Sequence, residues 1–178
     1  MLTFCCSALW FITIIANNGD ITHVKNVQRQ YNSIHYTSDE ILYGQREYWA
    51  SPRETLSRWQ GDCEDISIVK YFALIEKGID SKHLRLAYLQ IGVQSFHIVV
   101  EVHFNETILV LDNRYSEVRL ANEEYYKQRI LSFNKESLWI NGQIVGVAID
   151  KMERWADLLK RMSFEQDNHE IDSQVGSP

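Results

Sequence analysis

The sequence is poor in the residues that mark long flexible linkers. Only two prolines and eight glycines occur among its 178 residues, which argues against extended disordered segments between domains. With 45% hydrophobic and 24% charged residues, the chain has the size and composition of one globular domain with its own hydrophobic core.

Clustered basic residues are lacking as well. The formal net charge is -6, whereas proteins that bind nucleic acid carry Lys and Arg gathered on one surface. The chain also has no internal repeat, no phosphate-binding glycine loop and no histidine pair spaced for zinc. These absences argue against nucleic acid as a partner and against a nucleotide or zinc site of a familiar kind.

Cysteine is scarce, and its three copies lie in two different settings. Cys5 and Cys6 belong to an uncharged apolar run from Leu2 to Ala16, which has the length of a signal-peptide core and is too short for a comfortable membrane span. No Lys or Arg precedes the run, so an uncleaved anchor and a buried strand are alternatives to a signal peptide at residues 1–16. If export removes this segment, Cys63 is the single cysteine left and a candidate reactive thiol.

Cys63 stands at the start of a predicted helix. Gly61 permits a close backbone approach, Asp62 is a favoured N-cap residue, and Cys63 falls in the first helical turn. The free N–H groups and the dipole at this end of a helix favour a thiolate. The carboxylates of Asp62, Glu64 and Asp65 oppose a thiolate, and a bound cation is the simplest group that offsets them. The alternative is an inert buried thiol among solvated carboxylates.

Hydrophobic periodicity predicts helices in the first half of the chain and strands in the second. Residues 66–75 repeat at helical spacing, and residues 96–104 alternate as a strand. A capping box at Ser51 predicts a short helix before Gly61. Further expectations are short helices between residues 20 and 46, strands at 84–91, 107–111, 137–140 and 143–148, a helix at 123–128, a last helix capped by Asp150, and a polar, disordered tail at 165–178.

The two central strands place a histidine and an aspartate on one face. If residues 105 and 106 form a two-residue hairpin loop, Val99 faces Asp112 and His97 faces Arg114. Asp112 then lies one diagonal step from His97, a separation of roughly 7–8 Å between backbones that side chains can bridge. A half-buried strand histidine and a turn aspartate without chemistry are the alternatives, and a register slip of one residue would separate the pair.

The order Cys63, His97, Asp112, on a helix followed by an antiparallel sheet, resembles the transglutaminase-like branch of the papain-like cysteine enzymes. The sequence is most similar to the bacterial transglutaminase-like cysteine proteases of the LapG type. This resemblance implies an α+β fold in which N-terminal helices, with the nucleophile at a helix N-terminus, pack on an antiparallel sheet. The residues that carry the resemblance are 48–52, 61–65, 71–72, 84–86, the strand of His97, 110–113, 132–134, 138–139, Trp155 and 158–159.

The resemblance also implies an activity. It makes the domain, expected at residues 17–164, a calcium-dependent endopeptidase in which Cys63 is the nucleophile, His97 the general base and acid, and Asp112 the residue that orients the imidazole. A transglutaminase that transfers the acyl group to an amine, and a degenerate domain that only binds, are the alternatives. The oxyanion would be stabilised by the N–H of Cys63 and by one donor among Trp49, Trp59 and Gln60.

Metal, partners and location follow from the same resemblance. The family binds Ca²⁺ through carboxylates beside the nucleophile, which correspond here to Asp62 and Glu64, with Asp65 as a third candidate. Its substrate is a large surface adhesin, cleaved near the N-terminus in the periplasm to promote biofilm dispersal. An inner-membrane receptor for cyclic-di-GMP sequesters the protease when this nucleotide is abundant.

Overall fold

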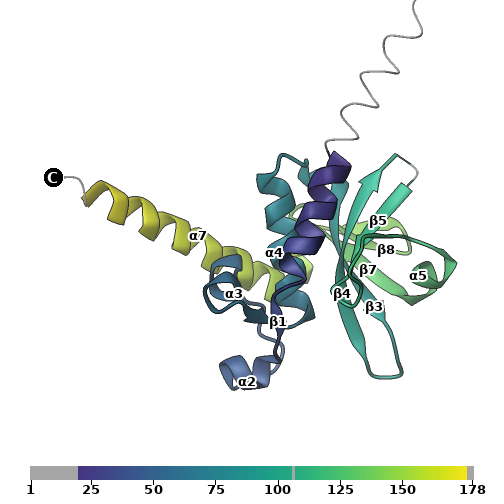
Figure 1. The fold of residues 1–178 in the computed structure, drawn as a ribbon, viewed down its shortest axis with the longest axis horizontal. Coiled ribbons are helices and arrows are strands. Elements are labelled where there is room, and N and C mark those ends of the chain that lie inside the picture. Colours follow the sequence, from purple (N-terminus) through teal and green to yellow (C-terminus); the bar gives the residue numbers. More distant parts are fainter. Residues whose placement is uncertain (1–19, 106, 176–178) are drawn as a thin grey trace, which may run out of the picture.

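A seven-stranded antiparallel sheet forms the centre of the computed structural model, which describes residues 20–105 and 107–175 (Figure 1). The predicted segment at residues 1–16 lies outside the described residues. The strand order is β6-β5-β4-β3-β7-β8-β9, so one strand of the predicted hairpin, β4, lies beside the central strand β3, and the other, β5, lies beside the edge strand β6. The strands are β3 (Leu84–Gln90), β4 (Phe96–Phe104), β5 (Thr107–Leu111), β6 (Arg119–Leu120), β7 (Arg129–Phe133), β8 (Leu138–Ile140) and β9 (Gln143–Gly146).

Helices cover both faces of this sheet. One face packs against α4, α7 and the helix at residues 20–31, and the other packs against α5 through a smaller apolar cluster (Figure 1). Two short parallel strands, β1 (His35–Tyr36) and β2 (Gln60–Gly61), form a separate ladder. The helices are α2 (Asp39–Tyr43), α3 (Pro52–Arg58), α4 (Cys63–Glu76), the 3₁₀ turn Ser81–His83, α5 (Glu123–Gln128), α6 (Ala148–Lys151) and α7 (Glu153–Val175). None of the helices within these described residues is long and apolar enough to cross a membrane.

The predicted hairpin register is confirmed. Phe104 pairs with Thr107, and Val100 pairs with Leu111, which are the partners that a two-residue loop requires. β4 is buried on both faces, because helices cover both sides of the sheet. The alternation along this strand therefore separates two buried environments and does not separate core from solvent.

Three expectations for other elements differ from the structure. β7 was not predicted, although it pairs with β3 in the middle of the sheet. Asp150 lies inside the short helix α6, and α7 begins at Glu153. α7 then continues to Val175, through most of the segment expected to be disordered, because extending an existing helix needs no new nucleation and no proline interrupts it before Pro178.

Aromatic side chains hold the C-terminal helix to the sheet and to α4. The indole of Trp155 on α7 is fully buried, 5.3 Å from the ring of Phe133 on β7 and 6.1 Å from that of Phe72 on α4, measured between centroids. Trp49, from the loop before α3, stacks on Phe133 at 5.8 Å. Contacts of this kind add to the burial of large apolar surfaces. They place the start of α7 and the loop before α3 against one core.

A buried and an exposed phenylalanine together test the contribution of this aromatic core to stability. Phe133→Ala is expected to reduce the free energy of unfolding by about 3–5 kcal/mol, because the ring is fully buried. Phe164→Ala is the matched control: its ring is 56% exposed, and the change is expected to stay within about 0.5 kcal/mol. Urea unfolding curves measure both, and similar losses in the two variants would contradict the packing described.

Candidate active site

The first turn of α4 is held close to the preceding chain by Gly61. A Cβ atom at this position would lie 2.7 Å from the Cβ of Asp65 and 3.2 Å from the methyl group of Thr55, closer than side chains pack. The predicted capping box of α3 is present, with Ser51 accepting from the N–H of Glu54. α3, β2 and the glycine together deliver Cys63 as the first residue of α4.

The Cys63 thiol is partly buried and faces a carboxylate. Its Sγ donates to Oε2 of Glu64 at 2.9 Å. Burial, Glu64 and Asp62 raise the pKa of the thiol, while a backbone hydrogen bond from Ile98 acts in the opposite direction. The helix N-terminus alone therefore does not produce a thiolate here, because the neighbouring carboxylates outweigh it.

His97 and Asp112 form the contact expected from the hairpin. Nε2 of His97 lies 2.8 Å from Oδ1 of Asp112, and both side chains are buried. The Nδ1 atom of the imidazole is thus left for a thiol. Cys63 and His97 line one cavity of about 390 Å³, together with Tyr88 of β3 and Ile98 of β4. The three sequence-predicted residues therefore converge on a single region.

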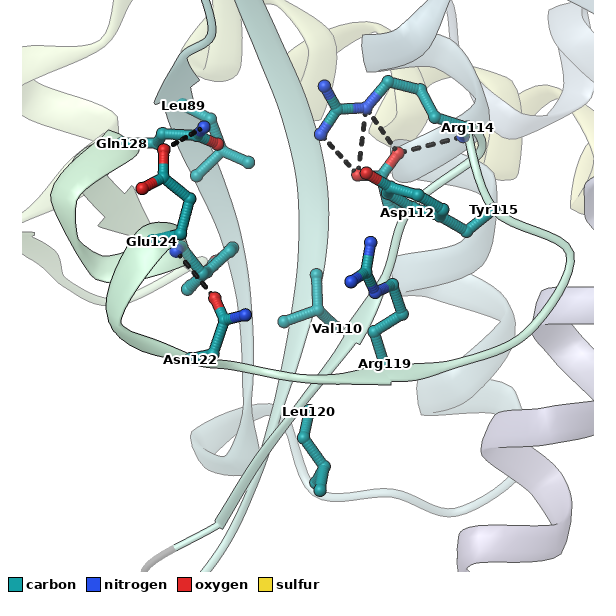
Figure 2. Close-up of a pocket in the computed structure, with 11 residues that line it drawn as sticks. Leu89, Val110, Asp112, Arg114, Tyr115, Arg119, Leu120, Asn122, Glu124 and Gln128 are labelled. Atoms are coloured by element: carbon teal, nitrogen blue, oxygen red, sulfur yellow. Dashed lines mark hydrogen bonds and ion pairs between the residues drawn. The ribbon is translucent and has the colours of Figure 1, made fainter.

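Arg114 is part of this site and was not identified from the sequence. Its guanidinium contacts Oδ2 of Asp112 at 2.7 Å through Nη2, and its backbone N–H donates to Oδ1 at 2.9 Å (Figure 2). Burial of Asp112 opposes ionisation, but the hydrogen bonds from His97 and Arg114 outweigh it and lower the pKa of the carboxyl group. Asp112 is thereby kept as a carboxylate that can only accept from the imidazole. The sequence did not indicate this role, because Arg114 lies in the turn after β5, where the alternation of a strand no longer predicts which way a side chain points.

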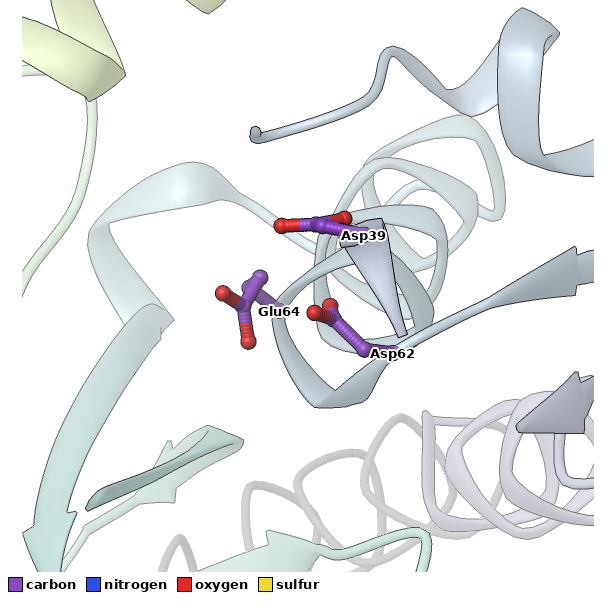
Figure 3. Close-up of side chains that lie close together, drawn as sticks. All are labelled: Asp39, Asp62 and Glu64. Atoms are coloured by element: carbon purple, nitrogen blue, oxygen red, sulfur yellow. The ribbon is translucent and has the colours of Figure 1, made fainter. Parts of the chain in front are cut away.

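Three carboxylates from two elements meet beside Cys63. Asp39 of α2 joins Asp62 and Glu64, with one oxygen of each within 4.8 Å of the others (Figure 3). Oδ1 of Asp39 and Oδ1 of Asp62 are buried and have no hydrogen-bond partner. Burial and neighbouring carboxylates raise the pKa of Asp39 to about 6 and that of Asp62 to about 9. Such orphaned, crowded oxygens fit a hard cation, which would satisfy and neutralise them.

Asp62 does not cap α4 with its side chain, and Asp65 does not join the acidic cluster. Asp62 occupies the N-cap position of α4 but makes no side-chain capping bond, since its carboxylate faces the acidic cluster. Asp65 is outside this cluster: its Oδ1 accepts the N–H of Ala50 at 2.8 Å. It therefore ties the loop before α3 to α4, and Asp39 stands in the place expected for Asp65. Nothing in the local sequence pattern marked Asp39 as a neighbour of Asp62, because the two residues meet only through the fold.

One of the candidate oxyanion donors is already engaged. The indole N–H of Trp59 donates to the carbonyl of Ser33 at 3.1 Å. The indole of Trp49 lies in the aromatic core described above, without a hydrogen-bond partner. The N–H of Cys63 at the first position of α4 remains as a donor that points along the helix axis, as unsatisfied N-terminal groups do.

Comparison with known proteins gives a family match for most of the chain. The family described as bacterial transglutaminase-like cysteine proteinase matches residues 11–143. Comparison with curated protein sequences gave no match.

Solved structures of one bacterial protein resemble this fold. Legionella pneumophila LapG is 30% identical in sequence, with 80% of this chain and 78% of that chain covered and a TM-score of 0.68. An EGTA-treated and a calcium-bound structure of the same protein are each 28% identical over 80% of this chain, with 79% and 80% of their own chains covered and TM-scores of 0.68 and 0.66. These matches confirm the predicted α+β fold of the transglutaminase-like type.

The acidic cluster predicts how stability depends on pH when no metal is bound. Aspartate in an unfolded chain titrates near pH 4, whereas the pKa of Asp39 is about 6 and that of Asp62 about 9 in the fold. Between these values the folded protein binds more protons than the unfolded chain, so stability falls as pH rises. In excess chelator, the melting temperature is expected to decrease from about pH 5 to about pH 8.

Matched variants assign this dependence to the cluster. Asp62→Asn is expected to flatten the pH dependence of the melting temperature, because it removes the carboxyl group with the highest raised pKa. Glu40→Gln serves as the control, since Glu40 neighbours Asp39 on α2 but its exposed carboxylate pairs with Arg46. A slope that is equally steep in both variants would locate the dependence elsewhere.

Proposed function

Because this chain belongs to the family of bacterial transglutaminase-like cysteine proteinases, we propose that it is a calcium-dependent cysteine endopeptidase that uses Cys63, His97 and Asp112. The observation that carries this proposal is the convergence of the three side chains. Cys63 and His97 line one cavity, and the far nitrogen of the imidazole is bound to Asp112. This is the arrangement that nucleophile, base and orienting acid require.

The residues act in two half-reactions. Nδ1 of His97 takes the proton from Sγ of Cys63, and the thiolate attacks the scissile carbonyl carbon to form a tetrahedral intermediate. The N–H of Cys63 donates to the developing oxyanion at the positive end of the α4 dipole. The imidazolium then protonates the leaving amine, so the peptide bond breaks and a thioester remains. Water hydrolyses the thioester, with His97 as general base.

Asp112 keeps the imidazole in the tautomer that this chemistry needs. Its Oδ1 accepts from Nε2 of His97, so the neutral ring carries its proton on Nε2 and presents the lone pair of Nδ1 to the thiol. The contacts from Arg114 hold the carboxylate in place and keep it ionised. The imidazolium is thereby stabilised by a fixed negative charge.

Calcium is the cation proposed for the acidic cluster. Asp39, Asp62 and Glu64 supply the carboxylate oxygens that this ion prefers, and calcium-bound and EGTA-treated structures exist for the similar LapG. The bound ion would neutralise charge beside Cys63. Glu64 would then no longer hold the thiol proton by its hydrogen bond, and His97 could accept it.

The substrate proposed is a large cell-surface adhesin, cut near its N-terminus in the periplasm to release it and promote biofilm dispersal. The proposed inhibitory partner is an inner-membrane receptor for cyclic-di-GMP. Both proposals are supported by the similarity to proteases of the LapG type. When cyclic-di-GMP is present, the receptor is expected to block cleavage of the adhesin.

Cleavage of such an adhesin tests the nucleophile. Purified protein with calcium is incubated with the N-terminal region of a large adhesin encoded by the same genome. Cys63→Ala is expected to lower the cleavage rate by roughly 10³-fold or more, because the covalent step is lost. Ser57→Ala, which changes an exposed serine on α3, is the control and should cleave normally.

The chemical form of the product separates the enzyme alternatives. Mass spectrometry is expected to find a new peptide N-terminus, as hydrolysis requires, whereas an isopeptide cross-link would indicate acyl transfer to an amine. Full adhesin processing by Cys63→Ala would contradict both enzyme activities.

Removal of the proposed ion should abolish activity. Excess chelator is expected to stop cleavage, and added calcium to restore it, because the uncompensated carboxylates keep the Cys63 thiol protonated. Asp39→Asn is expected to weaken calcium binding by roughly tenfold or more in calorimetric titration, while Glu40→Gln binds as the wild type does. Unchanged cleavage in excess chelator would overturn the calcium requirement.

A further inference from the structure

Lys70 is a fully buried cation that the proposed chemistry does not use. It lies on α4 two helical turns after Cys63, on the same side of the helix. Its Nζ donates to Oε1 of Gln28 at 2.9 Å and to Oδ1 of Asn32 at 2.6 Å. Among the ion pairs of the described residues, none involves Lys70, so two neutral amides take the place of a counter-ion.

The two amides connect Lys70 to the turn that carries Asp112. Nε2 of Gln28 donates to the carbonyl of Asp112 at 2.9 Å and to that of Tyr115 at 2.7 Å. Nδ2 of Asn32 donates to the same Tyr115 carbonyl at 2.6 Å. An ammonium group only donates hydrogen bonds, so it fixes the oxygen side of each amide toward itself and the NH₂ side toward the turn.

This arrangement fixes the backbone from which the Asp112 side chain extends. The turn is closed by the N–H of Tyr115, which donates to the Asp112 carbonyl at 3.2 Å. Gln28 therefore holds both ends of the turn, and Arg114 within it holds the Asp112 carboxylate. The helix at residues 20–31, which lies beside α4 in Figure 1, is joined through these contacts to the site.

Burial of a lysine at this position is costly. An ammonium without an anionic partner loses hydration that two amide oxygens replace only in part, and an apolar side chain would avoid this loss but would leave both amide oxygens without a donor. Burial lowers the pKa of Lys70 to about 7, while the charge of Asp112 acts against this shift. The neutral amine still has two N–H bonds, enough for both amide oxygens.

We propose that Lys70, Gln28 and Asn32 are positioning residues, which hold the Asp112 turn and thereby set the orientation of His97 toward Cys63. The inference rests on the proposed function, since it assigns a role within the same site. It makes the helix at residues 20–31 a part of the catalytic apparatus, although its side chains do not line the cavity that contains Cys63 and His97.

Gln28→Glu is the sharpest test. A glutamate has the same shape and can pair with Lys70, but its carboxylate cannot donate to the carbonyls of Asp112 and Tyr115. In the full, calcium-loaded chain, kcat for adhesin cleavage is expected to fall roughly tenfold to a hundredfold, with KM changed less than about twofold. Gln30→Glu adds the same charge at an exposed position of the same helix and is expected to leave kcat unchanged.

Lys70→Met provides a second variant, which removes the donor and leaves both amides in place. It is expected to lower the melting temperature, because the oxygens of Gln28 and Asn32 lose their hydrogen-bond donor, and to lower kcat as Gln28→Glu does, because the two amides lose the group that orients them. A readout independent of activity is the far-downfield proton resonance of Nε2–H in His97, which reports its bond to Asp112. This resonance is expected to shift or broaden in both variants and to stay in place in Gln30→Glu.

The outcomes separate this proposal from the proposed function. Wild-type kcat and an unshifted His97 resonance in both variants would overturn the positioning role while leaving the protease intact. If the wild-type protein cleaves no adhesin, the proposed function fails, and the His97 resonance still decides the positioning role. A loss of activity that matches a loss of melting temperature, with the resonance unshifted, would also overturn the proposal.

Discussion

Crowded negative charge at the N-terminus of α4 is the constraint on which the site depends. The carboxylates of Asp39, Asp62 and Glu64 meet there, beside the thiol of Cys63, and the helix dipole offsets only part of their repulsion. Gly61 permits this close approach, and α2 supplies the third acid from a distant part of the chain. A cation at this point would change the local charge and the reactivity of the thiol together.

A second buried carboxylate shows that this crowding is not a general property of the fold. Glu101 on β4 is completely buried, but Tyr125, Arg129 and His103 all contact its oxygens. Burial opposes ionisation of Glu101, yet these partners outweigh it and lower its pKa. The same protein thus satisfies a structural acid fully and leaves oxygens of Asp39 and Asp62 without partners. Unsatisfied and crowded carboxylate oxygens of this kind suit a bound cation, whereas the oxygens of Glu101 are already occupied by protein donors.

The sequence predicted those parts of the site that depend on local pattern. The alternation of β4 and the two-residue loop placed His97 near Asp112, and the glycine and helix signals placed Cys63. It did not predict β7, whose partner β3 is remote in sequence, nor Asp39 as a neighbour of Asp62. Lys70 was hidden for the same reason, because one polar residue in an apolar helix does not reveal the amides that it meets. Local periodicity carries no information on such long-range partners.

The β4–β5 hairpin has a consequence for how the molecule assembles. His97 and Asp112 are brought together by closing a short loop, so their contact requires little loss of chain entropy. Cys63 reaches them only when α4 docks on the sheet, and the Asp112 turn is secured only when the helix at residues 20–31 docks as well. Contacts between remote segments form more slowly than local ones. This topology favours formation of the contact between His97 and Asp112 before Cys63 docks beside it. A partly folded chain therefore carries an exposed thiol that His97 does not yet activate.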